Sequence, residues 1–209
     1  MVEFSILKRS HITALIVIGI VSISCSNKTK NQVNKYLNDD SQITFEKFHP
    51  YAQQILTEEF YWSPIEETGP FGSDAGSDAF YGFRKWRRQN RDKSPVEYLD
   101  KLIAEWNFKK SFDYNELNDS LINKYISEYP IGDMVLIEID NAIIAIGFGQ
   151  YVIEGMIDND ILELTKIAIE RELKPTLIEL FRSDYQDTRR QRLTKMKSVI
   201  TKMRKKGSS

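Results

Sequence analysis

The chain has 209 residues, a formal net charge of −1, one cysteine and two histidines. This length suits one domain, or one domain with a tail, and is enough to bury a sizeable core. The single cysteine excludes an internal disulfide and a cysteine-ligated zinc site, and two histidines are too few for a metal site built from several histidines. We therefore expect no cofactor and no dedicated metal site. Carboxylates and amides could still bind a hard cation.

The first 24 residues have the pattern of a secretory signal. Lys8 and Arg9 form a positive cluster, and an apolar run of 12 residues, Ile12 to Ile23, follows. A membrane span needs roughly 20 apolar residues, so this run is too short. A small residue followed by Cys25 resembles the cleavage site of bacterial lipoproteins, in which the cysteine is lipidated and becomes the new N-terminus. We therefore predict a signal peptide at residues 1–24 and a membrane contact through lipidated Cys25.

Two details of this pattern bear on where the protein resides. Ser22 stands where lipoprotein signals favour Leu or another aliphatic residue, so an ordinary secretion signal with an incidental cysteine is the alternative. Ser26 stands where Asp would be expected for retention at the inner membrane, which resembles the default for outer-membrane lipoproteins. We expect the protein in the cell envelope, at the outer membrane rather than the inner membrane.

Residues 25–42 are rich in Asn, Lys and Asp and predict a flexible tether, and residues 43–206 predict one helical domain. The first folded segment starts near Thr44, and Pro50 suits a first helical turn. Its apolar residues recur at helical spacing: Phe45, Phe48, Tyr51, Ile55 and Leu56.

A loop of turn-forming residues from Thr68 to Asp78 follows, and Ser77 or Asp78 could cap a helix that begins at Ala79. Ser94-Pro95-Val96-Glu97 then has the composition of a capping box, and it predicts a helix through Trp106. A further helix is predicted from Tyr114 to Glu128. The side chains that we expect on its inward face are Leu117, Leu121, Tyr125 and Ile126.

Residues 133–154 allow two interpretations. The segment 134–146 contains two runs rich in β-branched residues, and Asp140-Asn141 could form the turn of a hairpin. In the other interpretation Asp140 is the N-cap of a buried helix from Asn141 to Glu154 that stops at Gly155. We favour the helix, although periodicity alone does not separate a buried strand from a buried helix.

Three more helices complete the prediction: one capped by Asp158, one that begins at Pro175 and one from Asp187 to Arg204. The whole pattern predicts an all-α fold, a single globular domain of about six to eight helices after the signal peptide and the tether. An apolar stripe on the last helix should dock it on the domain: Leu193, Met196, Ile200 and Met203.

Charge is distributed unevenly along the chain. From Ser26 to Ser183 there are 27 acidic and 18 basic residues, whereas from Asp184 to Ser209 there are two acidic and nine basic residues. We expect the cations of the last helix to face water or carboxylates, with anionic lipid headgroups as an alternative partner. An exported lipoprotein seldom meets nucleic acid, so we expect no nucleic-acid partner.

Several segments together resemble a group of uncharacterised bacterial proteins, the YfeS-like proteins. The resemblance extends over most of the chain from Phe48 to Met203. The segments that carry it are His49-Pro50, Phe60-Tyr61-Trp62-Ser63-Pro64, Pro70-Phe71-Gly72-Ser73-Asp74, Asp78-Ala79, Trp86, Gly149-Gln150, Glu154-Gly155, Ile157-Asp158 and Ala168-Ile169-Glu170-Arg171. Because the group has no established function, the resemblance implies no activity and no catalytic residue. A lipoprotein signal would make this chain a relocated version of the same domain.

The candidate binding loop contains Asp74 and Asp78, with Trp62 and Phe71 beside it. Two carboxylates in a glycine-rich loop could bind a hard cation or act in acid–base chemistry. The spacing lacks the pattern of a calcium-binding loop, and Asp is common at helix starts, so we favour capping roles. The aromatic residues could line a groove, but core packing is favoured, and His49 is favoured as a helix-start residue.

Three functions remain open from the sequence. The favoured one is a membrane-anchored, non-catalytic binding module with a protein partner or another envelope component. The second is an immunity or inhibitor lipoprotein that binds a toxin. The third is an envelope hydrolase with a carboxylate pair drawn from Asp74, Asp78, Glu66 and Glu67. The chain is therefore not expected to be an enzyme, and no catalytic residue is assigned.

Overall fold

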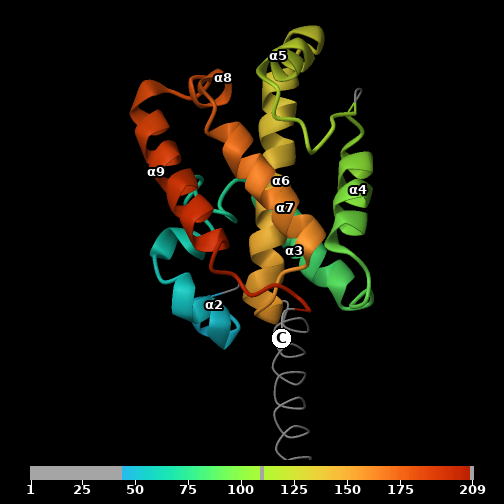
Figure 1. Cartoon of the computed structure of the whole chain (residues 1–209), viewed down its shortest axis with the longest axis vertical. Coiled ribbons are helices and arrows are strands. Elements are labelled where there is room, and N and C mark those ends of the chain that lie inside the picture. Colours follow the sequence, from blue (N-terminus) through green and yellow to red (C-terminus); the bar gives the residue numbers. More distant parts are fainter. Residues whose placement is uncertain (1–43, 109–110, 208–209) are drawn as a thin grey trace, which may run out of the picture.

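A long helix, α6 (Gly132–Glu154), runs through the middle of the molecule, and other helices pack around it (Figure 1). The computed structural model describes residues 44–108 and 111–207. Most side chains of α6 are buried, as expected for a helix that is hydrophobic all round. Within the described residues α6 is long and apolar enough to cross a membrane. However, 83% of its most apolar stretch of 18 residues is buried inside the domain, as in a core helix.

The remaining elements are two short 3₁₀ helices and seven α-helices. They are η1 (Phe45–Lys47), α2 (Pro50–Ile55), η2 (Glu59–Tyr61), α3 (Asp74–Arg87), α4 (Pro95–Trp106), α5 (Asp119–Glu128), α7 (Asn159–Glu172), α8 (Pro175–Ile178) and α9 (Ser183–Ile200). The part of the chain that the structure describes thus has eight α-helices and no strand, which confirms the predicted all-α fold. The predicted signal peptide, Cys25 and the tether lie outside the described residues.

Small residues let α3 and α7 approach α6 closely. A Cβ at Gly147 would overlap the side chain of Thr165 on α7, and one at Gly149 would come within 2.7 Å of the ring of Phe80 on α3. The buried hydroxyl of Thr165 donates a hydrogen bond of 2.7 Å to the carbonyl of Ile161. The contact between α6 and α7 is therefore close without leaving this hydroxyl unsatisfied.

The stretch 133–154 is helical, which confirms the favoured interpretation over the hairpin. The predicted start at Asn141 is wrong, because the helix begins at Gly132 and Asp140 lies in its middle rather than at its N-cap. Asp140 is buried and pairs with Arg171 of α7. Arg171 is 31 residues away from Asp140 in the chain, so the sequence near Asp140 does not reveal the pair. From that local sequence, an acidic residue at this position predicts a helix cap.

The start of α3 also differs from the prediction. The helix begins at Asp74, one turn before Ala79, and the side chain of Ser73 accepts a hydrogen bond of 3.1 Å from the backbone N–H of Gly76. The predicted caps, Ser77 and Asp78, therefore lie inside the helix. Several residues of this loop can cap a helix, and only the tertiary position of the loop selects Ser73.

The start of α5 was predicted incorrectly, and so was one residue of its buried face, whereas Tyr125 is buried as predicted. The helix begins at Asp119 rather than Tyr114, because the side chain of Asn118 accepts hydrogen bonds from the first turn. Leu121, which was expected to face inward, is 51% exposed, and its neighbour Ile122 is buried instead.

Other local predictions are confirmed. Ser94 caps α4 by accepting a hydrogen bond of 3.0 Å from Val96 N–H, and α8 begins at Pro175. The helix α9 spans Ser183–Ile200 rather than 187–204, and its apolar stripe is buried as expected: Leu193, Met196, Ile200 and, just beyond the helix, Met203. Exposed cations of α9 pair with carboxylates, as Lys197 does with Glu170 at 3.5 Å.

His49 and Gly155 join α2 to the end of α6. Nδ1 of His49 accepts a hydrogen bond of 3.2 Å from the backbone N–H of Tyr51, which confirms His49 as a helix-start residue. The backbone N–H of His49 donates a hydrogen bond of 2.8 Å to the carbonyl of Val152 in α6. Burial lowers the pKa of His49, and Arg204 acts in the same direction, so the ring can accept this bond as a neutral base. Tyr51 itself is 39% exposed.

We expect Gly155→Ala to destabilise the domain strongly. Gly155 ends α6 with a φ of 69°, and a Cβ there would overlap the His49 ring. Left-handed strain and overlap together should lower the free energy of unfolding by about 2–4 kcal/mol in chemical denaturation. Gly207 is the matched control, because its φ is 88° and a Cβ there would meet nothing within 4 Å. Equal losses in Gly155→Ala and Gly207→Ala would contradict the His49 contact.

Candidate functional site

A cleft lies where the loop after η2 meets the start of α9. One part is a cavity of about 260 Å³, and a second part of about 460 Å³ adjoins it through shared residues. We call the two parts together the Glu67 cleft. The residues that line it and are used below are Glu67, Asp74, Asn141, Phe181, Tyr185 and Arg189, with Arg182 and Asp184 at the outer part.

Aromatic side chains form one wall of the Glu67 cleft. Phe181 lies just before α9 and Tyr185 in its first turn, with ring centroids 5.4 Å apart and an angle of 37° between the ring planes. Burial raises the pKa of Tyr185; the Arg189 guanidinium opposes this shift and the Glu67 carboxylate reinforces it. The phenol therefore stays neutral near pH 7 and can donate a hydrogen bond to a ligand.

The rim of the Glu67 cleft carries more negative than positive charge. Glu67 and Asp74 are exposed, and they enter from the loop and from the first turn of α3. Asp184 pairs with Arg182 at 2.6 Å, and both side chains are largely exposed. The positive charge of Arg189 is already matched by a buried carboxylate, so Glu67 and Asp74 leave the rim acidic.

The loop that carries Glu67 is folded tightly on itself. The Thr68 hydroxyl donates a hydrogen bond to the Glu66 carboxylate, and Gly69 N–H donates to the Glu66 carbonyl at 2.7 Å. A Cβ at Gly72 would overlap the backbone of Glu66, so the loop can close only with glycine at this position. These contacts fix the place of Glu67 before any ligand arrives.

Arg189 forms the floor of the cleft. Its side chain is 2% exposed and donates hydrogen bonds to three different parts of the fold. The acceptors are the Thr68 carbonyl at 3.2 Å, Asn141 Oδ1 of α6 at 2.8 Å and Glu172 Oε2 of α7 at 2.9 Å. Arg189 thus ties the Glu67 loop, α6 and α7 to α9.

A second buried ion pair lies directly beside this floor. Nε of Arg171 donates to the two carboxylate oxygens of Asp140 at 3.1 and 3.0 Å, and neither side chain is exposed. Arg171 also donates to the carbonyls of Tyr114 and Glu116, at 3.0 and 2.8 Å. Burial raises the pKa of Asp140 to about 7, although Arg171 opposes the shift.

The two pairs form one unit, because Arg171 and Glu172 are consecutive in α7 and Asp140 precedes Asn141 in α6. We call Asp140, Arg171, Glu172 and Arg189 the buried ionic cluster. One oxygen of Glu172, Oε1, has no hydrogen-bond partner among the residues that the structure describes. The cluster is therefore costly to bury, and it specifies how α6, α7 and α9 meet beneath the Glu67 cleft.

The residues of the predicted binding loop do not come together. Asp74 lines the cleft, whereas Asp78 is exposed one turn further along α3 and does not line it. Phe71 is a core residue whose ring centroid lies 4.4 Å from that of Phe80, which confirms the core interpretation. Trp62 is half-buried near Phe45, with ring centroids 6.2 Å apart.

The aromatic wall and the floor of the cleft were not predicted from the sequence. Tyr185 and Arg189 are spaced by four residues on one helix, which places them on the same face. That signal was lost because the helix was expected to begin only at Asp187. In residues 44–108 and 111–207, no group of three or more His, Cys, Asp or Glu side chains could hold a metal ion.

We expect Arg171→Met to destabilise the domain in a pH-dependent way. Loss of this cation leaves Asp140 buried and unpaired, which should cost about 3–5 kcal/mol of unfolding free energy at about pH 8. Without Arg171 the pKa of Asp140 rises further above its unfolded value of 3.8, so the folded variant retains a proton that the unfolded chain releases. The loss should therefore shrink toward about pH 5, as measured by urea titrations across this range.

Arg190→Met is the matched control for this experiment. Arg190 is exposed on α9, next to Arg189 in the chain, and its replacement should change the free energy of unfolding by less than about 0.5 kcal/mol. A pH-independent loss in Arg171→Met would contradict the assigned role of Asp140.

The chain is similar to one named bacterial protein. It is 26% identical over 144 residues to the uncharacterized protein YfeS of Escherichia coli (strain K12), which confirms the resemblance to YfeS-like proteins. The match covers 68% of this chain and 57% of YfeS, so the chain spans a little over half the length of this curated relative. No protein-family model and no solved structure matches the chain. Because YfeS is itself uncharacterised, the similarity brings no activity and no site residues to the Glu67 cleft.

Proposed function

We propose that this protein is a lipid-anchored, non-catalytic binding module of the bacterial cell envelope, with the Glu67 cleft as its binding site. The secretory pattern of residues 1–24 and the cysteine that follows support the anchor. The polar composition of residues 25–42 suits a tether between lipid and domain. The observation that carries the binding role is an acidic and aromatic cleft built over the buried ionic cluster.

The chemistry of the cleft favours a ligand with a cationic group, such as the lysine or arginine side chain of a protein partner. Glu67 and Asp74 offer carboxylates from two sides, and the rings of Phe181 and Tyr185 offer faces that attract a cation. The fixed loop and floor reduce the conformational entropy that binding would otherwise cost. The outer part of the cleft is wide enough to admit a peptide side chain rather than only an ion.

A hydrolase is the second candidate, because Glu67 and Asp74 line one cavity and could form a carboxylate pair. Their exposure weighs against this role, since a carboxylic acid that works at neutral pH usually needs burial to keep its proton. Burial does raise the pKa of Asp140 and of Glu138, but neither lines the cleft. The toxin-inhibitor alternative is a special case of the binding role, with a toxin as the protein partner.

We expect the peptide tetralysine amide to bind the protein, as measured by isothermal titration calorimetry, and tetraglutamate to bind far more weakly. Glu67→Gln and Asp74→Asn should each weaken tetralysine binding by about two- to fivefold, since each removes one exposed ion pair. Asp78→Asn is the matched control, because it removes the same charge from the same helix outside the cleft. If all three variants weakened binding equally, the effect would be one of net charge and the proposed site would be wrong.

Anchoring is tested separately with Cys25→Ser in the full chain. We expect the native protein to incorporate labelled fatty acid and to fractionate with membranes. The variant should lack the label and be released into the soluble envelope fraction, because serine offers no thiol for acylation. Label that persists in Cys25→Ser would contradict the anchor.

A further inference from the structure

The end of the described chain lies beside its beginning. Figure 1 shows α2 and the segment that follows α9 (red) at the same end of the molecule. The guanidinium of Arg204 lies 4.1 Å from the centre of the Tyr51 ring in α2. The segment is fixed further by two backbone hydrogen bonds of 2.9 Å, from Ile157 N–H to the Arg204 carbonyl and from Lys206 N–H to the Ile157 carbonyl. The last described residues therefore lie beside α2 and beside the segment that precedes α7.

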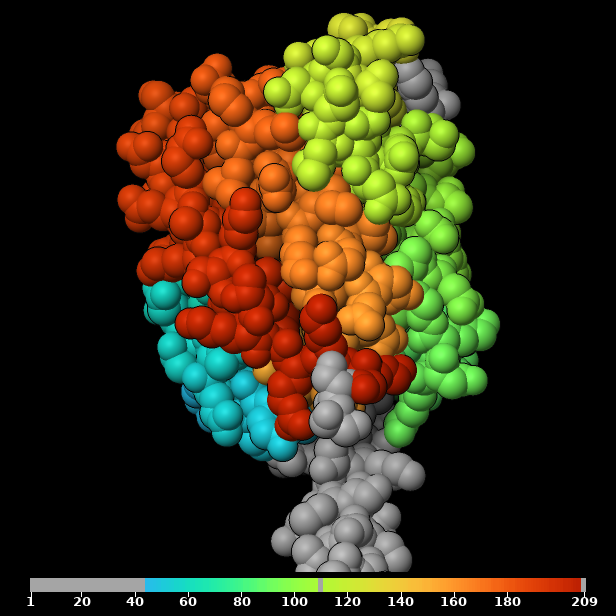
Figure 2. All heavy atoms as spheres, viewed as in Figure 1, coloured from blue at the N-terminus to red at the C-terminus, as the bar shows by residue number. Residues whose placement is uncertain are grey.

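This end of the molecule carries a dense group of cations. Lys202, Arg204, Lys205 and Lys206 are all exposed, and the chain contains no acidic residue after Asp187. We call these four residues the basic end. Figure 2 shows the C-terminal segment (red) on the surface between the α2 region (cyan) and the α3–α4 region (green).

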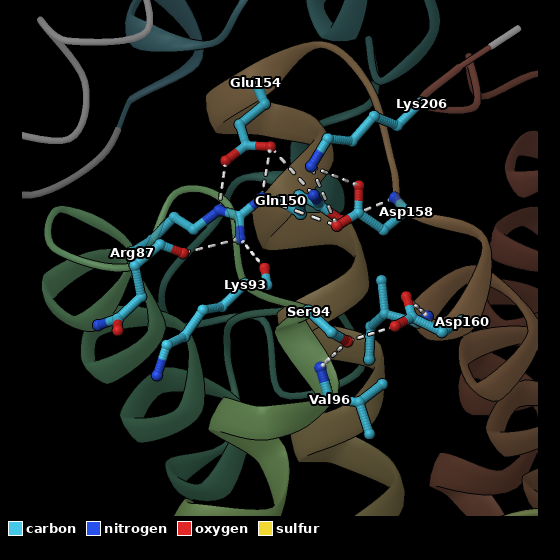
Figure 3. Close-up of polar contacts among 11 residues, drawn as sticks. Arg87, Lys93, Ser94, Val96, Gln150, Glu154, Asp158, Asp160 and Lys206 are labelled. Atoms are coloured by element: carbon cyan, nitrogen blue, oxygen red, sulfur yellow. Dashed lines mark hydrogen bonds and ion pairs between the residues drawn. The ribbon is translucent and has the colours of Figure 1, made fainter.

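The nearest carboxylates are largely occupied by internal partners (Figure 3). Glu154 accepts hydrogen bonds from buried Arg87 at 2.6 Å and from Gln150 at 3.0 Å. Oδ2 of Asp158 lies 3.8 Å from Nη2 of Arg87, and Oδ1 of Asp158 lies 3.3 Å from Nζ of Lys206. Asp160 accepts a hydrogen bond from the hydroxyl of Ser94.

Two cations of the basic end remain available. Within the described residues neither Lys202 nor Lys205 makes an ion pair, whereas Lys206 is shared with Asp158. Arg204 keeps its charge exposed while its guanidinium lies over the ring of Tyr51. The basic end thus keeps a positive charge that the carboxylates among the described residues neutralise only at Lys206.

We infer that the basic end binds anionic phospholipid headgroups and sets the domain on the membrane with its Glu67 cleft pointing away. This inference rests on the proposed lipid anchor, which would hold the basic end near a membrane. The 18 residues between Cys25 and Thr44 span at most about 65 Å, so lipidation at Cys25 would keep the surface within that reach of the bilayer.

The direction of the cleft follows from α9. Tyr185 and Arg189 lie near the start of this 18-residue helix, and the basic end follows its last turn. At 1.5 Å per residue, the helix extends about 22 Å from Tyr185 and about 16 Å from Arg189 to its last residue, Ile200. A domain that stands on its basic end therefore presents the acidic cleft to the surroundings and keeps it away from anionic headgroups.

The test is a vesicle flotation assay with the mature chain from residue 25 onward carrying Cys25→Ser, so that neither an acyl chain nor the apolar run at Ile12–Ile23 contributes. We expect binding to vesicles of equal parts phosphatidylglycerol and phosphatidylcholine, weakened by salt, and little binding to phosphatidylcholine alone. The added variant Lys202→Gln/Lys205→Gln should reduce the affinity by about 25-fold, at about fivefold per charge. These two lysines have no ion-pair partner in the described chain, so the fold should tolerate the change.

The matched control is Lys101→Gln/Arg190→Gln, which removes the same charge from exposed positions on α4 and α9 away from the basic end. It should change vesicle affinity by less than about twofold. Equal losses in the two double variants, or equal binding to both kinds of vesicle, would overturn the inference. Binding to single-stranded DNA as tight as binding to anionic vesicles at the same salt would also overturn it, because the surface would then be a general polyanion site.

The vesicle assay and the acylation experiment test different proposals, so a negative result in one does not decide the other. Absent vesicle binding with labelled Cys25 would overturn the membrane-facing role of the basic end and leave the anchor standing. Vesicle binding by the Cys25→Ser chain, together with an unlabelled native protein, would overturn the anchor and the orientation that depends on it.

Discussion

The structure depends on the burial of α6, a helix with apolar side chains on nearly every face. Such a helix has no solvent side, so it must be covered all round, and α3 and α7 do this by packing against its glycines. Complete burial leaves no water for Asp140, which therefore takes Arg171 as its partner. The hydrophobic core and the buried ion pair are consequences of the same central helix.

The Glu67 cleft inherits its shape from that arrangement. Arg189 reaches from α9 to the Glu67 loop, to Asn141 of α6 and to Glu172 of α7, so the floor of the cleft moves only if three elements move together. Buried ion pairs add little to stability compared with apolar packing, but they restrict which partners can meet. We interpret the buried ionic cluster as the device that fixes the cleft, with the apolar core providing most of the stability.

Much of the fold could be predicted from the sequence, because local chemistry decides most helix starts and buried faces. Ser94 and Pro95 mark the start of α4, and the stripe from Leu193 to Met203 marks the docked face of α9. Prediction failed where a residue distant in the sequence decides the role of a side chain. From its local sequence Asp140 predicts a helix cap, but in the fold it pairs with Arg171 in the middle of α6. The cleft could not be predicted, since its residues lie on a loop, on α3, on α6 and on α9, and only the fold brings them together.

The acidic rim of the Glu67 cleft and the cations of the basic end lie at opposite ends of α9. Electrostatic screening at physiological ionic strength acts over about 8 Å, well below the roughly 16 to 22 Å of helix between the two ends. A charged body that approaches one end therefore experiences the field of that end alone. The proposed cationic ligand and the proposed anionic headgroups would therefore be attracted at the two ends simultaneously, and neither encounter would weaken the other.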